Sequence, residues 1–298
     1  NHMDPLESVV TIFNRQICNL TEGNENALGG IVCVWNDRAV ANGDDVMIMN
    51  PVYPGMLAFA ERSWRGGGYA GWTATIGEPE TERATAFAEF ENRLLDQKQQ
   101  YFKGLDFPYV KQADLVWDIY GPYENKGNLS KVFAPESIKF NALKEKPKYK
   151  ATGGTLVMKH WWAPLISGVV EQPQENTTWY AQTQIWSDED KQREFWIGFN
   201  NLSRSMSTDS PNAGTWNNLK SQVWVNNELV SPPLWKHPNQ KGNLEIPLID
   251  EGYEFREPTL ISLKKGWNTV KVKLPVASFK GPNWTNPVKW MFTFVEVK

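Results

Sequence analysis

The amino-acid sequence predicts an α/β part at the N-terminus, followed by an all-β, jelly-roll-like β-sandwich. The hydrophobic period supports this division. Near residue 110 it changes from about 3.6 residues, typical of helices, to about two, typical of strands. The length supports it as well, because 298 residues lie at the upper limit for one hydrophobic core. We therefore expect two units of different architecture.

The first expected element is a helix that begins at Pro5. Asp4 is a suitable N-cap, Pro5 fits the first helical position, and Glu7 completes a capping box. Apolar residues then recur at steps of four and three, which places them on one face of a helix. These residues are Leu6, Val10, Phe13, Ile17 and Leu20.

A strand and two more helices are expected next. Residues 31–35 are an apolar run without alternation, which is typical of a parallel strand buried on both faces. Residues 54–64 and 79–102 predict helices, and the glycines at 66–68 predict the end of the first of these. The expected buried face of the 54–64 helix comprises Met56, Leu57, Ala60 and Trp64.

The remainder of the chain predicts many short strands. Alternating side chains mark residues 180–186 and 270–274, and the run at 288–297 is apolar on both faces, as in a central strand. Asn226-Asn227 between two short apolar runs predicts a β-hairpin. Short strands with turns rich in Pro, Asn and Gly indicate a β-sandwich, which we expect to be jelly-roll-like.

Composition excludes several classes of function. The net charge of −3 and the pI of about 5.8 leave no basic face for nucleic acid. No apolar run approaches the about 20 residues that a membrane helix needs. Two cysteines give no disulfide framework, and three dispersed histidines suggest no metal site, so we expect no metal and no cofactor. Tryptophan is the anomaly: 11 of the 15 follow position 160, which directs attention to the sandwich.

Three motifs permit more than one interpretation. The glycines at 66–71 match a dinucleotide-binding pattern, but they follow a helix instead of a strand, so a helix stop is favoured. Asp188-Glu189-Asp190 is interpreted as a solvated turn, with an ion or catalytic site as the alternative. Trp35 and Asp37 end the expected buried strand, where they either contact a ligand or pack structurally.

The late tryptophans divide into two groups. Those at alternating strand positions are expected in the core, namely Trp186, Trp224 and Trp290. Those in loops are either structural or part of an exposed platform that makes secondary sugar contacts, namely Trp216, Trp235 and Trp284.

Two segments resemble a known family. Residues 28–38, with Trp35-Asn36-Asp37 at their end, resemble the last barrel strand of family 20 glycoside hydrolases, the β-N-acetylhexosaminidases. Residues 54–64, which include Ala60-Glu61-Arg62-Ser63-Trp64, resemble the helix that closes that barrel. The opening residues 1–5 are similar to an Asn-x-x-Asp segment of the family, and motifs such as Gly214-Thr215-Trp216 resemble the β-sandwich of bacterial members.

The resemblance implies three units. Residues 1–75 would be the C-terminal end of a TIM-barrel catalytic domain, residues 76–110 a connecting helix, and residues 111–298 a C-terminal β-sandwich domain. In the family, a Trp-x-Glu motif binds the sugar. Carried over, Trp35 walls the acetamido pocket and Asp37, one methylene shorter than Glu, holds the distal hydroxyls.

The resemblance also implies what lies elsewhere. The family uses the substrate's own acetamido group as nucleophile, oriented by an Asp-Glu pair on the fourth barrel strand. That pair is expected before residue 1, so no catalytic residue is assigned here and the chain is expected to be inactive alone. The implied parent is a periplasmic, cell-envelope or secreted exo-β-N-acetylhexosaminidase that releases terminal GlcNAc or GalNAc with retention.

Partners follow from the same resemblance. We expect an N-acetylhexosamine-containing glycan as ligand, and either the missing N-terminal part of the barrel or self-association to cover exposed apolar surface. Neither nucleic acid nor a membrane is expected. The alternative function is a carbohydrate-binding, lectin-like β-sandwich without catalytic activity, and a third interpretation is that the sandwich merely buttresses the barrel.

Overall fold

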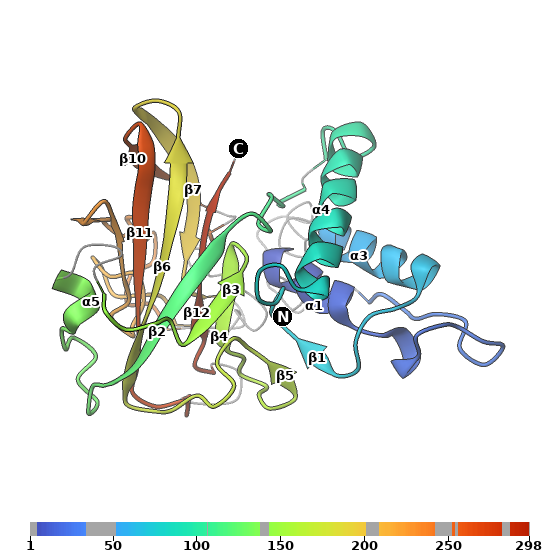
Figure 1. Ribbon diagram of the computed structural model, residues 1–298, viewed down its shortest axis with the longest axis horizontal. Helices are drawn as coiled ribbons and strands as arrows, with labels where there is room; N and C mark the ends of the chain where they lie inside the picture. Colours follow the sequence, from blue (N-terminus) through green and yellow to red (C-terminus); the bar gives the residue numbers. More distant parts are fainter. Residues whose placement is uncertain are drawn as a thin grey trace.

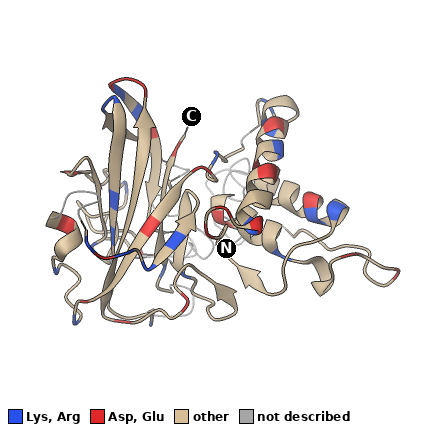
Figure 2. Cartoon of the chain, in the orientation of Figure 1, with Lys and Arg blue, Asp and Glu red and all other residues tan. Residues whose placement is uncertain are grey.

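The structure is a computed structural model of the 298-residue chain. It describes residues 5–33, 52–105, 107–137, 143–200, 209–241, 252–253, 256–281 and 287–297. Most of the helices gather on one side of the molecule and a β-sandwich forms the other, with one short helix, Ala134–Ser137, on the far side of the sandwich (Figure 1). Acidic and basic residues are interspersed over both parts in the view of Figure 2.

The helices of the described residues lie mainly before residue 101. They are α1 (Pro5–Asn14), η1 (Ile17–Asn19), α3 (Val52–Arg65), α4 (Glu82–Gln100) and α5 (Ala134–Ser137). All three helices predicted from periodicity are therefore present, although their ends differ. Thr81 caps α4, since its side-chain oxygen accepts a hydrogen bond from the Ala84 backbone N–H at 3.3 Å.

The first helix ends at Asn14 instead of continuing to Leu20, because the chain next pairs with the segment that follows α3. The backbone N–H of Gln16 donates to the carbonyl of Tyr69 at 3.2 Å. Cys18 then adopts a positive φ of 54°, which a regular helix excludes. The last apolar positions of the predicted face consequently lie outside the helix.

The buried face of α3 also differs from the prediction. Gly55 and Ala58 are buried, whereas Ala60 is exposed and Trp64 is 91% exposed. A Cβ on Gly55 would lie 3.2 Å from the side chain of Ile12 in α1, so the absence of a side chain at Gly55 lets α3 pack closely against Ile12. The small size of Gly55 thus helps to select this face, together with Ala58 and Leu57, which pack in the same apolar cluster.

The glycines after α3 terminate the helix, as predicted. The N–H of Gly66 donates to the carbonyl of Arg62 at 2.9 Å, and Gly66 has a φ of 64°. Gly68 lies against the backbone of Arg15, where a Cβ would approach to 2.9 Å. These glycines therefore permit a left-handed turn and close chain packing.

The described residues form twelve strands. They are β1 (Trp72–Thr73), β2 (Val116–Glu124), β3 (Tyr149–Thr152), β4 (Thr155–Lys159), β5 (Ile166–Ser167), β6 (Thr177–Ser187), β7 (Lys191–Gly198), β8 (Gln222–Val225), β9 (Glu228–Leu229), β10 (Thr259–Leu263), β11 (Gly266–Val276) and β12 (Trp290–Glu296). One antiparallel sheet has the order β3-β2-β6-β11-β8-β9, and another has the order β10-β7-β12-β4. The predominantly β, antiparallel character of this part is confirmed, and jelly-roll connectivity stays a prediction.

The core of the sandwich lies between these two sheets. Its largest side chains come from both of them, with Trp117 and Trp179 from the six-stranded sheet and Trp290, Phe292 and Phe294 from the four-stranded sheet. Trp117 meets Phe292 edge to face, with ring centroids 4.8 Å apart. The predicted core position of Trp290 and the predicted central strand at the C-terminal end are confirmed.

The predicted hairpin is also present. β8 and β9 pair in an antiparallel manner around Asn226 and Asn227, which have φ angles of 52° and 67°. Two successive residues with positive φ are typical of a type I′ turn, and asparagine tolerates this conformation better than most residues.

The helical part packs on the outer face of the four-stranded sheet. Phe13 and Phe90 stack with ring centroids 4.6 Å apart, and the same apolar cluster includes Trp196 of β7 and Val295 of β12. Strand β1 also pairs in parallel with β5, which lies beyond the expected domain boundary. Helices therefore cover one outer face of the sandwich (Figure 1).

A buried histidine further joins α1 to the sandwich. Nδ1 of His160 accepts the backbone N–H of Trp162 at 3.0 Å, so in the neutral ring Nε2 carries the proton. Nε2 faces a carboxylate oxygen of Glu7 at 3.2 Å, and both side chains are fully buried. The imidazole ring of His160 stacks on the indole of Trp161, with ring centroids 4.1 Å apart.

The predicted strand at 31–35 is not supported by its described part. Residues 31–33 belong to no strand, and Ile31 is 88% exposed. A buried parallel strand needs neighbours on both edges, and no described strand pairs with this segment. The described residues therefore do not confirm a fragment of a TIM barrel, and the domain boundaries stay predictions.

Candidate functional site

Three of the predicted sugar-contacting residues are Trp35, Asp37 and Trp284, which lie outside the described residues. Their roles as substrate-binding or secondary contact residues therefore stay predictions.

The other two loop tryptophans have hydrogen-bonded indoles. Trp216 is 4% exposed, packs near Phe199 and donates through Nε1 to the carbonyl of Val230 at 3.1 Å. It therefore lies within the sandwich, which fits the structural alternative for this residue and not the exposed platform. Trp235 is half-buried, and the guanidinium of Arg256 lies 4.9 Å from its ring centroid.

The motif helix α3 uses its charged residues to hold neighbouring helices. A carboxylate oxygen of Glu61 accepts from Arg93 of α4 at 2.6 Å. The guanidinium of Arg62 lies 4.3 Å from the ring centroid of Phe13 in α1, which is cation–π geometry. Burial lowers the pKa of Arg62, but arginine stays charged at neutral pH. Trp64 points away from this cluster into solvent.

Several large apolar side chains of the N-terminal part are exposed. Leu28, Ile31 and Trp64 are almost fully exposed, and Val32 is partly so. Leu28, Ile31 and Val32 belong to one short segment, and contiguous exposed apolar surface commonly marks a site that another surface covers.

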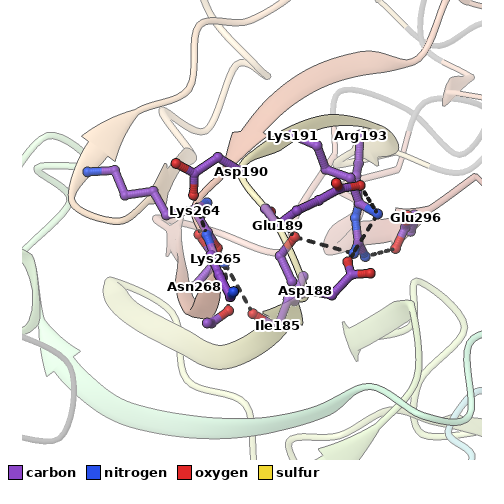
Figure 3. Close-up of polar contacts among 12 residues, drawn as sticks. Ile185, Asp188, Glu189, Asp190, Lys191, Arg193, Lys264, Lys265, Asn268 and Glu296 are labelled. Carbon is purple, nitrogen blue, oxygen red and sulfur yellow. Dashed lines mark hydrogen bonds and ion pairs between the residues drawn. The ribbon is translucent and has the colours of Figure 1, made fainter.

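The acidic turn between β6 and β7 is a network of ion pairs. Lys191 contacts Asp188 at 3.2 Å and Glu189 at 3.3 Å, while Arg193 contacts Glu296 at 3.0 Å (Figure 3). Both Asp188 and Glu189 are largely exposed. Within the described ranges, no group of three His, Cys, Asp or Glu side chains is arranged to hold a metal ion. These features favour the solvated-turn interpretation.

The adjacent β10–β11 turn is attached to this acidic turn. The backbone N–H of Lys265 donates to a carboxylate oxygen of Asp190 at 2.6 Å. The side chain of Asn268, buried beneath the turn, accepts from the Lys264 N–H at 2.8 Å and donates to the Lys264 carbonyl at 2.7 Å. It also accepts from Asn226 at 2.7 Å, which connects the β8–β9 turn.

Next to these turns lie two exposed indoles, which we call the tryptophan pair. Trp186 of β6 and Trp267 of β11 are directly opposite each other in the antiparallel register. Their ring centroids are 5.4 Å apart at an interplanar angle of 71°. Trp186 is 54% exposed and Trp267 is 63% exposed.

The exposure of Trp186 corrects its predicted core position. Trp179 and Ala181 of the same strand point into the sandwich, so the alternation places Trp186 on the outer face with Gln182 and Gln184. Trp224 was also predicted in the core. Its neighbours on β8, Val223 and Val225, point into the core, so Trp224 lies on the outer face, where it is half-buried.

Trp267 was not a candidate from sequence. The alternation of glutamines up to Trp186 was a usable sign that this tryptophan is on a polar face. The contact with Trp267 depends on strand register between segments far apart in the chain, for which the sequence has no local signal.

Among the described residues, no helix is both long enough and apolar enough to cross a membrane.

Comparison with known proteins gives limited similarity. No protein-family model matches the chain, and no curated protein is detectably similar to it. Among solved structures, a β-glucosidase from Kluyveromyces marxianus aligns with a TM-score of 0.27 and 12% identity over 62% of this chain and 17% of that chain. The same enzyme in complex with glucose aligns with a TM-score of 0.26 and 11% identity, over 61% and 16%. The matched part thus spans about a sixth of those chains. TM-scores this low do not establish a shared fold.

Proposed function

We propose that this chain is the C-terminal part of an exo-acting β-N-acetylhexosaminidase related to family 20 glycoside hydrolases. In this proposal, the enzyme releases terminal GlcNAc or GalNAc with retention by substrate-assisted catalysis. The observation that carries it is the segment resembling the barrel-closing helix: it forms α3, and its Glu61 and Arg62 bind α4 and α1.

The exposed apolar side chains of the N-terminal part are a second support. Leu28, Ile31 and Trp64 present the kind of surface that further barrel units would cover. Trp35 and Asp37 follow shortly after residues 28–33 in the chain. In this proposal, Trp35 holds the acetamido group and Asp37 holds the sugar hydroxyls.

The isolated chain is expected to be catalytically silent, whereas a longer reading frame that contains it should be active. The Asp-Glu pair that orients the acetamido group and protonates the leaving oxygen is proposed to precede this chain. General acid catalysis alone contributes about 10²–10⁴-fold in rate. The measurement is release of nitrophenol from a nitrophenyl N-acetyl-β-glucosaminide by residues 1–298 and by the longer protein.

The matched control substrate is the nitrophenyl β-glucoside, which lacks the acetamido nucleophile. The longer protein should leave it intact, and the released N-acetylhexosamine should keep the β configuration in an NMR time course. Normal turnover by the isolated chain, or preference of the longer protein for the plain glucoside, would overturn the proposal.

In the longer enzyme, replacing Trp35 with alanine should lower kcat as well as raise KM, because the acetamido group loses the wall that positions it for attack. Asp37→Asn keeps the shape but loses the charge of a hydrogen bond worth about 1.5–3 kcal/mol. We expect kcat/KM to fall by about tenfold to a hundredfold. Asp96→Asn, an exposed site on α4, is the control.

Steady-state kinetics and thermal unfolding of the same samples separate the two interpretations of this pair. If Trp35 and Asp37 merely pack the barrel rim, the variants will melt earlier but keep near-normal kcat/KM while folded. That result would remove both residues from the proposed sugar site.

The rival function, a carbohydrate-binding sandwich without catalytic activity, is favoured by one observation, the exposed tryptophan pair. Glycan binding by the isolated chain, together with an inactive longer protein, would favour this rival.

A further inference from the structure

We propose that Trp186 and Trp267 form a binding platform for a neutral oligosaccharide on the outer face of the six-stranded sheet. This site does not depend on the hexosaminidase relationship, because it lies wholly within the sandwich. It also differs from the loop tryptophans that the sequence singled out.

The geometry of the pair presents aromatic surface to solvent. The two indoles stand on neighbouring strands at directly opposed positions, and both are more than half exposed. In this edge-to-face pair, the large exposed fractions of both indoles leave aromatic surface open to solvent. The apolar C–H face of a pyranose ring is a suitable partner for an indole face, since both are flat and weakly polar.

The platform is held rigidly. Three turns are joined behind it, because Asn268 binds the backbone of the β10–β11 turn and the side chain of Asn226, while Asp190 accepts from the Lys265 N–H. Trp267 immediately precedes Asn268 in β11. A surface that is already ordered loses little conformational entropy on binding, which favours a weakly interacting ligand such as a sugar.

The residues beside the pair suit sugar hydroxyls. Gln184 lies two residues before Trp186 on β6, and Thr269 lies two residues after Trp267 on β11. The two are directly opposite each other, on the same side of the sheet as the indoles. Both are half-buried, and an amide and a hydroxyl each donate and accept hydrogen bonds. Beyond them the sheet is covered, because Lys271 is buried and donates to the carbonyl of Pro135 in α5.

The charges around the pair favour a neutral ligand. The two turns and the end of β12 carry four acidic and four basic residues, several of them paired with one another (Figure 3), and the neighbouring β8–β9 hairpin adds Glu228. The acidic members are Asp188, Glu189, Asp190 and Glu296, and the basic members are Lys191, Arg193, Lys264 and Lys265. A balanced group attracts neither an anionic glycan nor a cation strongly.

The small apolar area argues against a second protein as the occupant. A stable protein interface buries about 1,200–2,000 Å² in total. Two indoles, each of about 150–250 Å² when wholly covered, provide a minor part of that area. A short oligosaccharide needs no more than such a strip of aromatic surface with hydrogen-bonding groups alongside it.

The test is titration of residues 1–298 with chitohexaose and cellohexaose, followed by tryptophan fluorescence and by the indole N–H signals in NMR spectra. We expect saturable binding of at least one of them, with shifts confined to Trp186 and Trp267, and no binding of hexagalacturonate, the anionic control. Trp186→Ala and Trp267→Ala should each weaken binding by about tenfold or more. Trp64→Ala, an exposed tryptophan of the helical part, is the matched control and should bind normally.

The pair also stabilises the sheet end as a cross-strand contact, so the alanine variants are expected to melt earlier. If they fail to fold, Trp186→Thr and Trp267→Thr replace them in the titration, because threonine removes the aromatic face but favours strands. Absence of binding by the wild-type chain at millimolar sugar, or binding unaffected by changes at both positions, would overturn the proposal. Concentration-dependent association that disappears in Trp267→Ala would overturn it as well, by assigning the pair to a contact between copies.

Discussion

Replacing Glu91 with alanine is expected to destabilise the fold by about 3 kcal/mol or more, because several buried donors lose their acceptor at once. One carboxylate oxygen accepts from the hydroxyl of Tyr109 at 2.7 Å and from the N–H of Gln112 at 2.9 Å. The other accepts from the N–H of Ala113 at 3.0 Å. The carboxylate therefore fixes the segment that connects α4 to the sandwich.

The same residue predicts a pH dependence. Burial raises the pKa of Glu91 above its ordinary value of 4.5, although the hydrogen bonds from Gln112, Tyr109 and Ala113 oppose this. The folded state thus retains the proton to higher pH than the unfolded chain does. The stability contributed by protonation is fully present below the unfolded pKa and is lost as pH rises through the folded pKa.

Denaturant unfolding of the wild type, Glu91→Ala and Glu91→Gln over a pH series measures both effects. The glutamine variant keeps one acceptor but places its amide N–H₂ toward a backbone donor, so we expect an intermediate loss without this titration. Glu89→Ala, an exposed site on the same helix, is the control and should change stability little. A loss at Glu91 no larger than the loss at Glu89 would contradict the assigned role.

The position of Glu91 shows which features of this contact the sequence can predict and which it cannot. Periodicity predicts the α4 helix and its apolar face, and Glu91 lies four residues after Phe87 and three before Leu94, on that same face. An acid at such a position signals a buried partner. The partner itself, the backbone at 112–113, follows from tertiary packing and is not encoded in the local pattern.

The N-terminal part shows a different limit. The apolar run at 31–35 matches a buried strand in pattern alone, yet its described residues are exposed because a strand is defined by its neighbours. In the same way, alternation placed Trp186 on a strand correctly, but which face is buried depends on the second sheet. The tryptophan pair required both the face and the register of β11.

A second large loss of stability is expected for Glu136→Ala. Glu136 of α5 lies 2.7 Å from the ammonium of Lys273, which is buried on β11, and it accepts the hydroxyl of Tyr180. Burial and the neighbouring carboxylate raise the pKa of that hydroxyl, so tyrosine remains a hydrogen-bond donor at neutral pH. Removing one partner of a buried ion pair costs about 3–5 kcal/mol, because the other charge stays buried without compensation.

Lys273 retains one carbonyl contact, from Lys131 at 2.8 Å, which is a weaker substitute for a carboxylate. Adding Lys273→Met to Glu136→Ala should therefore restore part of the stability, since no buried charge then remains unpaired. The exposed pair of Lys150 and Asp118 on the same sheet is the matched control, and Asp118→Ala should cost less than about 1 kcal/mol. Free energies from denaturant unfolding of the single and double variants give the coupling between the two charges. The pair does not fasten α5 to the sheet if Glu136→Ala costs no more than Asp118→Ala. The same conclusion follows if the loss of the double variant, relative to the wild type, equals the sum of the two single losses.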